Sequence, residues 1–190
     1  MVHGIAHYLG KIWRKPTREM LQSRLVQWRA GESIVKVAKP LRIDRARALG
    51  YKAKKGVVVF RVRVKRGGRK RTRHKHGRVS RKQHVRKILK MNYQWVAEMR
   101  AERNYPNLEV LNSYQIARDG KSYFYEVIMI DPTRPEIKND PGLNWICKSE
   151  NRNRAQRGLT SSARKSRGLR TKSKDAKVRP SQRAWERQGK

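Results

Sequence analysis

Apolar residues recur every three or four positions in several stretches of the chain, which is the spacing of one helix face. This spacing predicts helices over 5–12, 17–30, 44–49 and 92–103. Gly31 follows the stretch 17–30 and Gly50 follows 44–49, and glycine commonly ends a helix at such a position. Asp44 is placed to cap the helix over 44–49. The last helix could also begin earlier, because Ser80 is the first residue of a capping-box pattern. The sequence therefore leaves the start of this helix open between Ser80 and Asn92.

Alternating or continuous apolar runs predict four strands, over 34–37, 57–64, 108–117 and 122–130. In the second run the apolar side chains face one way, and Arg61, Arg63 and Lys65 face the other. Asp119-Gly120 predicts a two-residue hairpin loop between the last two runs. That loop pairs Ile116 with Tyr123, Tyr114 with Tyr125, Asn112 with Val127 and Val110 with Met129. Both faces of this hairpin are largely apolar, so other elements are expected to cover each of them.

The order of these elements predicts an α+β fold with a small, four-stranded, mostly antiparallel sheet, helices, long basic extensions and a C-terminal tail. Three regions are predicted: N-terminal helices and the first strand in 1–43, an α+β core in 44–147 with a basic loop at 65–90, and a basic tail in 148–190. Beyond Cys147 the apolar spacing stops, and such a composition buries too little apolar surface to offset the entropy of ordering it. The tail is therefore expected to be disordered in the free protein.

The charge of the chain predicts what kind of partner it binds. The 190 residues include 50 Lys or Arg and 14 Asp or Glu, a formal net charge of +36. From 45 to 97 there are 20 basic residues and no acidic one, and 148–190 carries 15 basic and three acidic residues. Only 98–147 is slightly acidic, with six basic and eight acidic residues. A compact protein with this charge repels itself, so the sequence predicts a polyanion as its partner.

The most concentrated basic stretch is 65–77, in which Gly67 and Gly68 lie among arginines and lysines. Glycine lets the backbone approach a phosphate chain closely, and guanidinium groups bind phosphate oxygens in pairs. A solvated loop or a localisation signal is the alternative, but the basic strand that leads into the stretch favours nucleic-acid binding. The candidate RNA-binding residues are Arg45, Arg47, Lys52, Lys54, Lys55, Arg61, Arg63, Lys65, Arg66, Arg69, Lys70, Arg71, Arg73, Lys75, Arg154, Arg157, Arg164, Lys165, Arg167 and Arg170.

Other classes of function find little support in the sequence. The longest apolar runs, such as 57–60 and 127–130, are far shorter than the roughly 20 residues of a membrane span, and the N-terminus lacks a signal-peptide pattern. Cys147 is the only cysteine, which excludes an internal disulfide and favours a reducing, intracellular setting. His3 and His7 share a helix face but have no third ligand nearby. No metal site, cofactor, catalytic residue, small-molecule substrate or membrane partner is expected.

Six blocks of the sequence are specific in combination: DRARALGYKAKKG at 44–56, RGGRKR at 66–71, YPNLEVLNSY at 105–114, YEVIMIDP at 125–132, RGLTS at 157–161 and RGLR at 167–170. In this order, over most of the chain, they resemble the archaeal and eukaryotic family of large-ribosomal-subunit protein fifteen, which is unrelated to the bacterial protein of that number. The chain departs from the family pattern at 115–120, and 73–90 matches it only loosely.

The resemblance implies a structural component of the large ribosomal subunit, in the cytoplasm, that binds ribosomal RNA and neighbouring ribosomal proteins and has no catalytic activity. It also implies a small sheet-containing domain whose extensions, the tail 148–190 among them, thread between RNA helices. A homo-oligomer is not expected. Two alternatives stay open: a DNA-packaging protein, which is typically richer in Lys and Ala with simpler repeats, and an RNA-modifying enzyme, which needs a cofactor loop or an acidic cluster.

Overall fold

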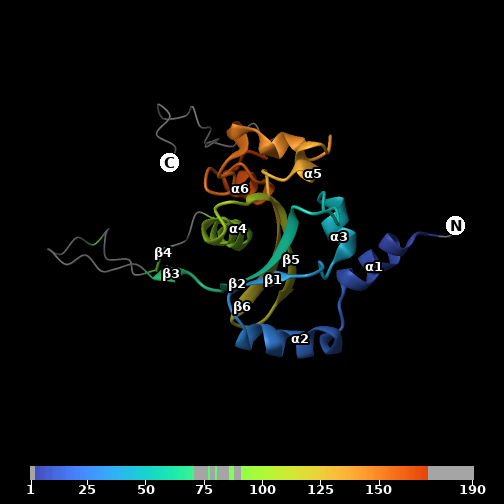
Figure 1. The fold of residues 1–190 in the computed structure, drawn as a ribbon. Coiled ribbons are helices and arrows are strands. Elements are labelled where there is room, and N and C mark those ends of the chain that lie inside the picture. Colours follow the sequence, from blue (N-terminus) through green and yellow to red (C-terminus); the bar gives the residue numbers. More distant parts are fainter. Residues whose placement is uncertain (1–2, 71–76, 78–79, 81–85, 88–90, 171–190) are drawn as a thin grey trace.

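We describe the protein from a computed structural model, in which the described residues are 3–70, 77, 80, 86–87 and 91–170 (Figure 1). The helices are α1 (Ile5–Arg14), α2 (Arg18–Ala30), α3 (Ile43–Ala48), α4 (Tyr93–Asn104), α5 (Pro135–Lys138) and α6 (Ser161–Ser166), with short 3-10 helices at Asn144–Cys147 and Ser149–Asn151. The strands are β1 (Ile34–Val37), β2 (Val57–Lys65), β3 (Arg69–Lys70), β4 (Arg86–Lys87), β5 (Glu109–Arg118) and β6 (Ser122–Ile130).

The centre of the fold is a four-stranded sheet in the order β1-β2-β6-β5, with every neighbouring pair antiparallel. Helix α4 covers one face, where Ala97 and Ala101 lie in one buried cluster with Val62 and Val127 of the sheet. Helix α2 covers the other face through Trp28, which belongs to a second cluster (Figure 1). The α+β prediction is confirmed, and so is the expectation that both apolar faces of the hairpin are covered.

The predicted helix ends agree with the structure at two places and differ at two. Asn92 caps α4 by accepting a hydrogen bond from the Trp95 amide, and Gly50 ends the α3 turn with a φ of 96°. The expectation that Asp44 caps α3 is wrong, because the helix begins at Ile43 and Asp44 lies inside its first turn. The earlier start for α4 is also wrong, since β4 pairs with β3 there. The expected capping residue Ser80 lies outside α4.

The hairpin of β5 and β6 has a different register from the expected one. Val110 does pair with Met129, but Asn112 pairs with Ile128, and Gln115 with Tyr125. Register shifts near Leu111 and again before Ala117 each add one residue to β5. The pair nearest the loop, Arg118 with Tyr123, already differs from the expected register, because the connection is longer than the expected two residues 119–120. The two bulges in β5 then return the strands to the expected pairing of Val110 with Met129.

The segment after Cys147 is folded as far as Arg170, contrary to the expected disordered tail. Ala155, Thr160 and Ala163 are fully buried, and α6 packs against α4. Apolar spacing does not reveal this segment because hydrogen bonds to buried carboxylates, rather than a stripe of large apolar side chains, attach it to the core. The expected tail beyond 170 lies outside the described residues.

No helix in the described part of the chain is both long and apolar enough to cross a membrane.

Candidate nucleic-acid interface

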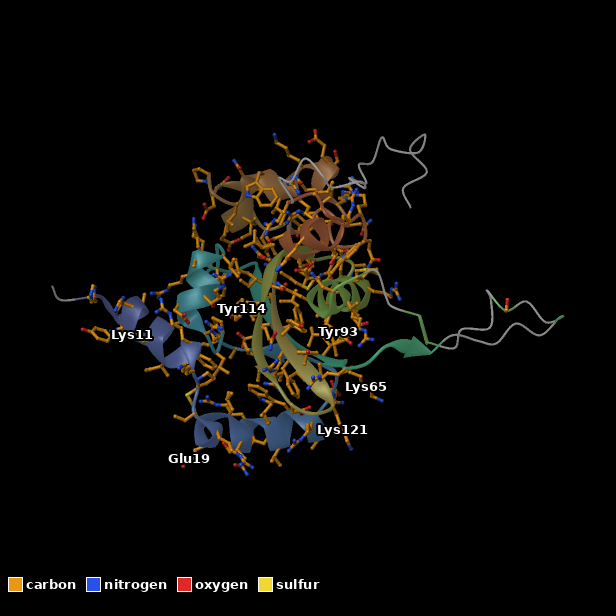
Figure 2. All side chains as sticks on the ribbon, turned by 180° about the vertical axis from the view of Figure 1, so that it is seen from behind. Lys11, Glu19, Lys65, Tyr93, Tyr114 and Lys121 are labelled. Atoms are coloured by element: carbon orange, nitrogen blue, oxygen red, sulfur yellow. The ribbon has the colours of Figure 1, made fainter. Side chains whose placement is uncertain are left out.

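The strand β2 leads directly into the basic stretch 65–77, and Tyr93 holds the base of that stretch, at Gly67. The Tyr93 hydroxyl accepts a hydrogen bond from the Gly67 amide at 2.9 Å and donates one to the Gly67 carbonyl at 3.0 Å. Gly67 has a φ of 103°, a backbone conformation that only glycine adopts readily. Figure 2 shows Tyr93 on α4 close to Lys65 at the end of β2. The chain therefore leaves the sheet from a fixed point.

Three further contacts fix the same point. The Tyr93 ring stacks on Tyr123 with 5.0 Å between centroids, and the Arg66 guanidinium lies 5.1 Å from the Tyr123 ring centroid. Arg66 also donates a 2.7 Å hydrogen bond to the carbonyl of Asp119 in the hairpin loop. The Lys65 amine, in contrast, is exposed and has no hydrogen-bonding or ion-pair partner in the described part of the chain. Beyond this base, β3 and β4 pair as a two-stranded ribbon.

A second group of exposed cations lies on and after α3, ahead of the start of β2. Ala46 is fully buried, which turns its neighbours Arg45 and Arg47 outward. Lys55 is exposed in the loop that follows. None of these three cationic groups has a hydrogen-bonding or ion-pair partner among the described residues. They are available to an external anion.

Lys52 and Lys54 have an internal partner. Both amines bind Asp140, at Nζ–Oδ2 distances of 2.8 and 2.6 Å, and the Gly142 amide donates to the same carboxylate. These hydrogen bonds hold the pKa of Asp140 far below its usual range. The two lysines therefore neutralise a buried carboxylate, while their side chains remain about half exposed.

Arg61 and Arg63 also have partners inside the protein. The Arg61 guanidinium lies 4.9 Å from the Trp28 ring centroid, and burial lowers its pKa. Arg63 donates to the carbonyls of Trp28, at 3.2 Å, and of Arg29 at the C-terminal end of α2. The predicted basic face of β2 is thus the face on which α2 packs.

Arg154 lies between buried acidic side chains of α4 and β5. It donates a 2.6 Å hydrogen bond to the Val110 carbonyl and lies 4.6 Å from the Trp145 ring centroid. Burial lowers its pKa, and the charges of Glu98 and Glu109 oppose that shift. Its charge compensates carboxylates in the interior.

Around this arginine, buried carboxylates bind the C-terminal segment. Glu98 accepts hydrogen bonds from the hydroxyls of Ser113, Thr160 and Ser162. Glu102 accepts from the amides of residues 155 and 156. Burial raises the pKa of both carboxyl groups, and the hydrogen bonds counteract part of that rise.

The remaining cations of this segment divide into two groups. Arg157 and Arg167 donate to backbone carbonyls within the segment, where Arg167 binds the Gly158 carbonyl at 3.0 Å. Arg164, Lys165 and Arg170 are exposed and have no hydrogen-bonding or ion-pair partner among the described residues. They form a third group of available cations, on and after α6.

Glu126 has a similar internal role on the other face of the sheet. It is buried, accepts a hydrogen bond from the Leu41 amide that both of its oxygens share, and accepts another from the Tyr114 hydroxyl. Burial raises its pKa, and the Arg61 charge lowers it. The carboxylate therefore fixes the chain that leads into α3.

The charges are thus divided between interior and surface. Of the eight acidic residues in 98–147, five are buried, namely Glu98, Glu102, Glu109, Glu126 and Asp140. The slightly acidic region consequently adds little negative charge to the surface. Local sequence patterns do not indicate these structural roles or that of Tyr93, because they depend on partners that lie as far as 88 positions away along the chain.

For five of the candidate RNA-binding residues the position of the side chain is not described. Arg71, Arg73 and Lys75 lie outside the described residues, and for Arg69 and Lys70 only the backbone is described. Within the described ranges, no three His, Cys, Asp or Glu side chains gather in a way that suits a metal ion.

Comparison with known proteins gives two concordant matches. The sequence profile of a family described as Ribosomal L15 matches residues 4–185. A protein of Methanocella arvoryzae, named large ribosomal subunit protein eL15, is 45% identical over 196 aligned positions that cover all of both chains.

Proposed function

The chain belongs to the Ribosomal L15 family in its archaeal and eukaryotic form, and from that premise we propose which of its surfaces hold ribosomal RNA. A member of this family is a structural protein of the large ribosomal subunit, binds ribosomal RNA and neighbouring ribosomal proteins, and works in the cytoplasm on the ribosome. The family is a structural, non-enzymatic class.

The RNA-binding surfaces are three groups of exposed cations around the core. They are Arg45, Arg47 and Lys55 near α3, Lys65 with the basic stretch that follows it, and Arg164, Lys165 and Arg170 near α6. The observation that carries this proposal is the division of charge, in which carboxylates are buried with partners while these cations stay exposed and unpaired in the described part. Because α3, the end of β2 and α6 lie in different directions around the sheet, RNA contacts the core from several directions (Figure 1).

The other candidates have a different primary role in this proposal. Arg61, Arg63, Arg154, Arg157 and Arg167 stabilise the fold, and Lys52 and Lys54 neutralise Asp140. Arg66 fixes the base of the basic stretch. Arg69, Lys70, Arg71, Arg73 and Lys75 keep their RNA-binding assignment from the sequence alone, as does the tail from 171, which we place between RNA helices.

The salt dependence of RNA binding tests the α3 group. Each phosphate contact contributes about 0.7 to 0.9 to the slope of log affinity against log salt, depending on the form of the RNA. Arg45→Gln with Arg47→Gln should therefore lower that slope by about 1.5. Arg100→Gln with Arg103→Gln removes the same charge from two exposed arginines of α4 and should change the slope less. Equal slopes in both double variants would show that only total charge matters.

We also propose that the protein acts as a single copy without catalysis, small-molecule substrate or membrane. Asp131 binds Thr133 within its own turn, and Glu126 binds the Leu41 amide, so both carboxylates have structural partners. Labelled ribosomal RNA incubated with the purified protein and magnesium should stay intact. Cleavage that disappears in Asp131→Asn or Glu126→Gln would establish a nuclease instead.

A further inference from the structure

Helix α1 exposes a continuous apolar row that the fold does not use. Ile5, Tyr8 and Ile12 are 75%, 50% and 52% exposed and account for three of the four large hydrophobic side chains exposed in the described part. Their spacing of three and four residues places them on one face of the helix. Val26 on α2, which is 53% exposed, is the fourth and lies apart from them in the sequence.

The opposite side of α1 already has its packing partner. Gly10 lies close to the Asp44 carboxylate, since a Cβ added there would be 3.9 Å from Oδ2. The Arg42 guanidinium lies 5.3 Å from the Trp13 ring centroid. These contacts attach α1 to α3 and fix which face of α1 points outward (Figure 1).

The row is bordered by positive charge. Lys11 and Arg14 are exposed on the same helix, Lys15 follows it, and α1 contains no acidic residue. A surface of this kind complements a segment with aliphatic side chains in its middle and carboxylates at its edges.

Other occupants fit this surface less well. RNA has no alkyl side chains against which two isoleucines could be buried. A second copy of this chain would bring its own net charge of +36 to a basic border. The chain's own residues 171–190 carry seven basic and two acidic side chains, so they would also add repulsion.

We infer that the Ile5–Tyr8–Ile12 row is the docking surface for a neighbouring large-subunit protein, which contributes an apolar segment flanked by Asp or Glu. The inference rests on the proposed function, because it places this chain in the large subunit. It adds a protein contact on α1 beside the RNA contacts on α3, so this edge of the fold joins a protein to the RNA.

Photocrosslinking in purified large subunits tests the docking surface. The subunits carry the full chain with benzoylphenylalanine in place of Tyr8, and separate preparations carry it in place of Val26 or Arg47. Position 8 should crosslink to one protein segment rich in aliphatic and acidic residues, with a yield at least about tenfold above that from position 26. Position 47 should crosslink to RNA.

The other outcomes overturn the inference. A crosslink from position 8 to RNA, to a basic protein segment or to another copy of this chain would show that the row binds something other than the inferred protein segment. No crosslink from position 8, when position 47 reaches RNA, shows that the row faces solvent. Failure of position 47 to reach RNA counts against the proposed α3 contact alone.

A triple variant gives a second, independent measurement. Ile5→Ser, Tyr8→Ser and Ile12→Ser together should reduce retention of the crosslinked neighbour on salt-washed subunits by about tenfold or more. Affinity of the free protein for ribosomal RNA should not change, and neither should its midpoint of urea unfolding, because all three side chains are exposed. Val26→Ser is the matched control. Full retention of the neighbour in the triple variant would contradict the docking role.

Discussion

The guanidinium of Arg61 lies over the indole ring of Trp28, 4.9 Å from its centroid, and so joins the central strand β2 to helix α2. Arg63, two residues along the same face, binds the carbonyls at the end of that helix. The sequence predicts that this basic face of β2 binds RNA. In the fold, α2 packs on the same face. The consequences can be measured separately as stability and as RNA binding.

Replacing Arg61 should weaken the fold more than it weakens RNA binding. Arg61→Gln removes the cation–π contact with Trp28, so the free energy of unfolding should fall by roughly 0.5–2 kcal/mol. Lys65→Gln is the control: it should leave urea unfolding unchanged and lower the salt slope of RNA binding by about 0.7–0.9. A lower slope with unchanged stability in Arg61→Gln would mean that this guanidinium leaves Trp28 to bind phosphate.

Removing the partly buried guanidinium of Arg154 should strongly destabilise the protein. Arg154→Met leaves the buried carboxylates of Glu98 and Glu109 without their nearest compensating charge, and breaking such a buried pairing costs about 3–5 kcal/mol. Arg152→Met, at an exposed position two residues away, should change the unfolding free energy by less than about 0.5 kcal/mol. Equal effects of the two substitutions in denaturant unfolding would contradict the compensating role.

Tyr93 should control the point at which the basic stretch leaves the sheet. Tyr93→Phe removes both hydrogen bonds to Gly67 but keeps the ring that stacks on Tyr123. Amide hydrogen exchange at Gly67 should therefore become faster, while exchange in the centre of β2 stays unchanged. Unchanged protection of the Gly67 amide would show that the hydroxyl does not hold this residue in solution.

The buried carboxyl group of Glu98 should make stability depend on pH. Burial raises its pKa in the folded protein, so the folded state takes up a proton before the unfolded state does as pH falls. The contribution of this group to the free energy of unfolding should therefore increase from neutral pH toward the ordinary range of a glutamate. Glu98→Gln should show a smaller increase when urea unfolding is measured between pH 7 and pH 5. Parallel curves for the two proteins would contradict a raised pKa.

Below that range Asp140 should have the opposite effect. Its pKa is lowered by Lys52 and Lys54, so the stability that it contributes is present above the ordinary pKa of an aspartate and is lost as pH falls below it. Asp140→Asn should be less stable than the wild type at neutral pH, and the difference should shrink on acidification toward pH 2. A difference that stays constant over this range would exclude ionic binding of the two lysines.

Local patterns in the sequence determined the elements and the kind of partner. Helical and alternating spacing predict the major helices and strands, because the periods of 3.6 and 2 depend only on backbone geometry. The end of α3 at Gly50 follows from a single residue. The surplus of basic residues predicts a polyanion by net charge alone, whatever the fold.

The tertiary structure alone decided which charges face outward. Arg45 and Arg61 look equivalent in the sequence, but the first is exposed beside a buried alanine and the second stacks on Trp28. Glu98 likewise carries no local sign that it binds Thr160, 62 positions away. Such contacts depend on how sheet and helices pack, and buried charges persist only where that packing supplies their partners.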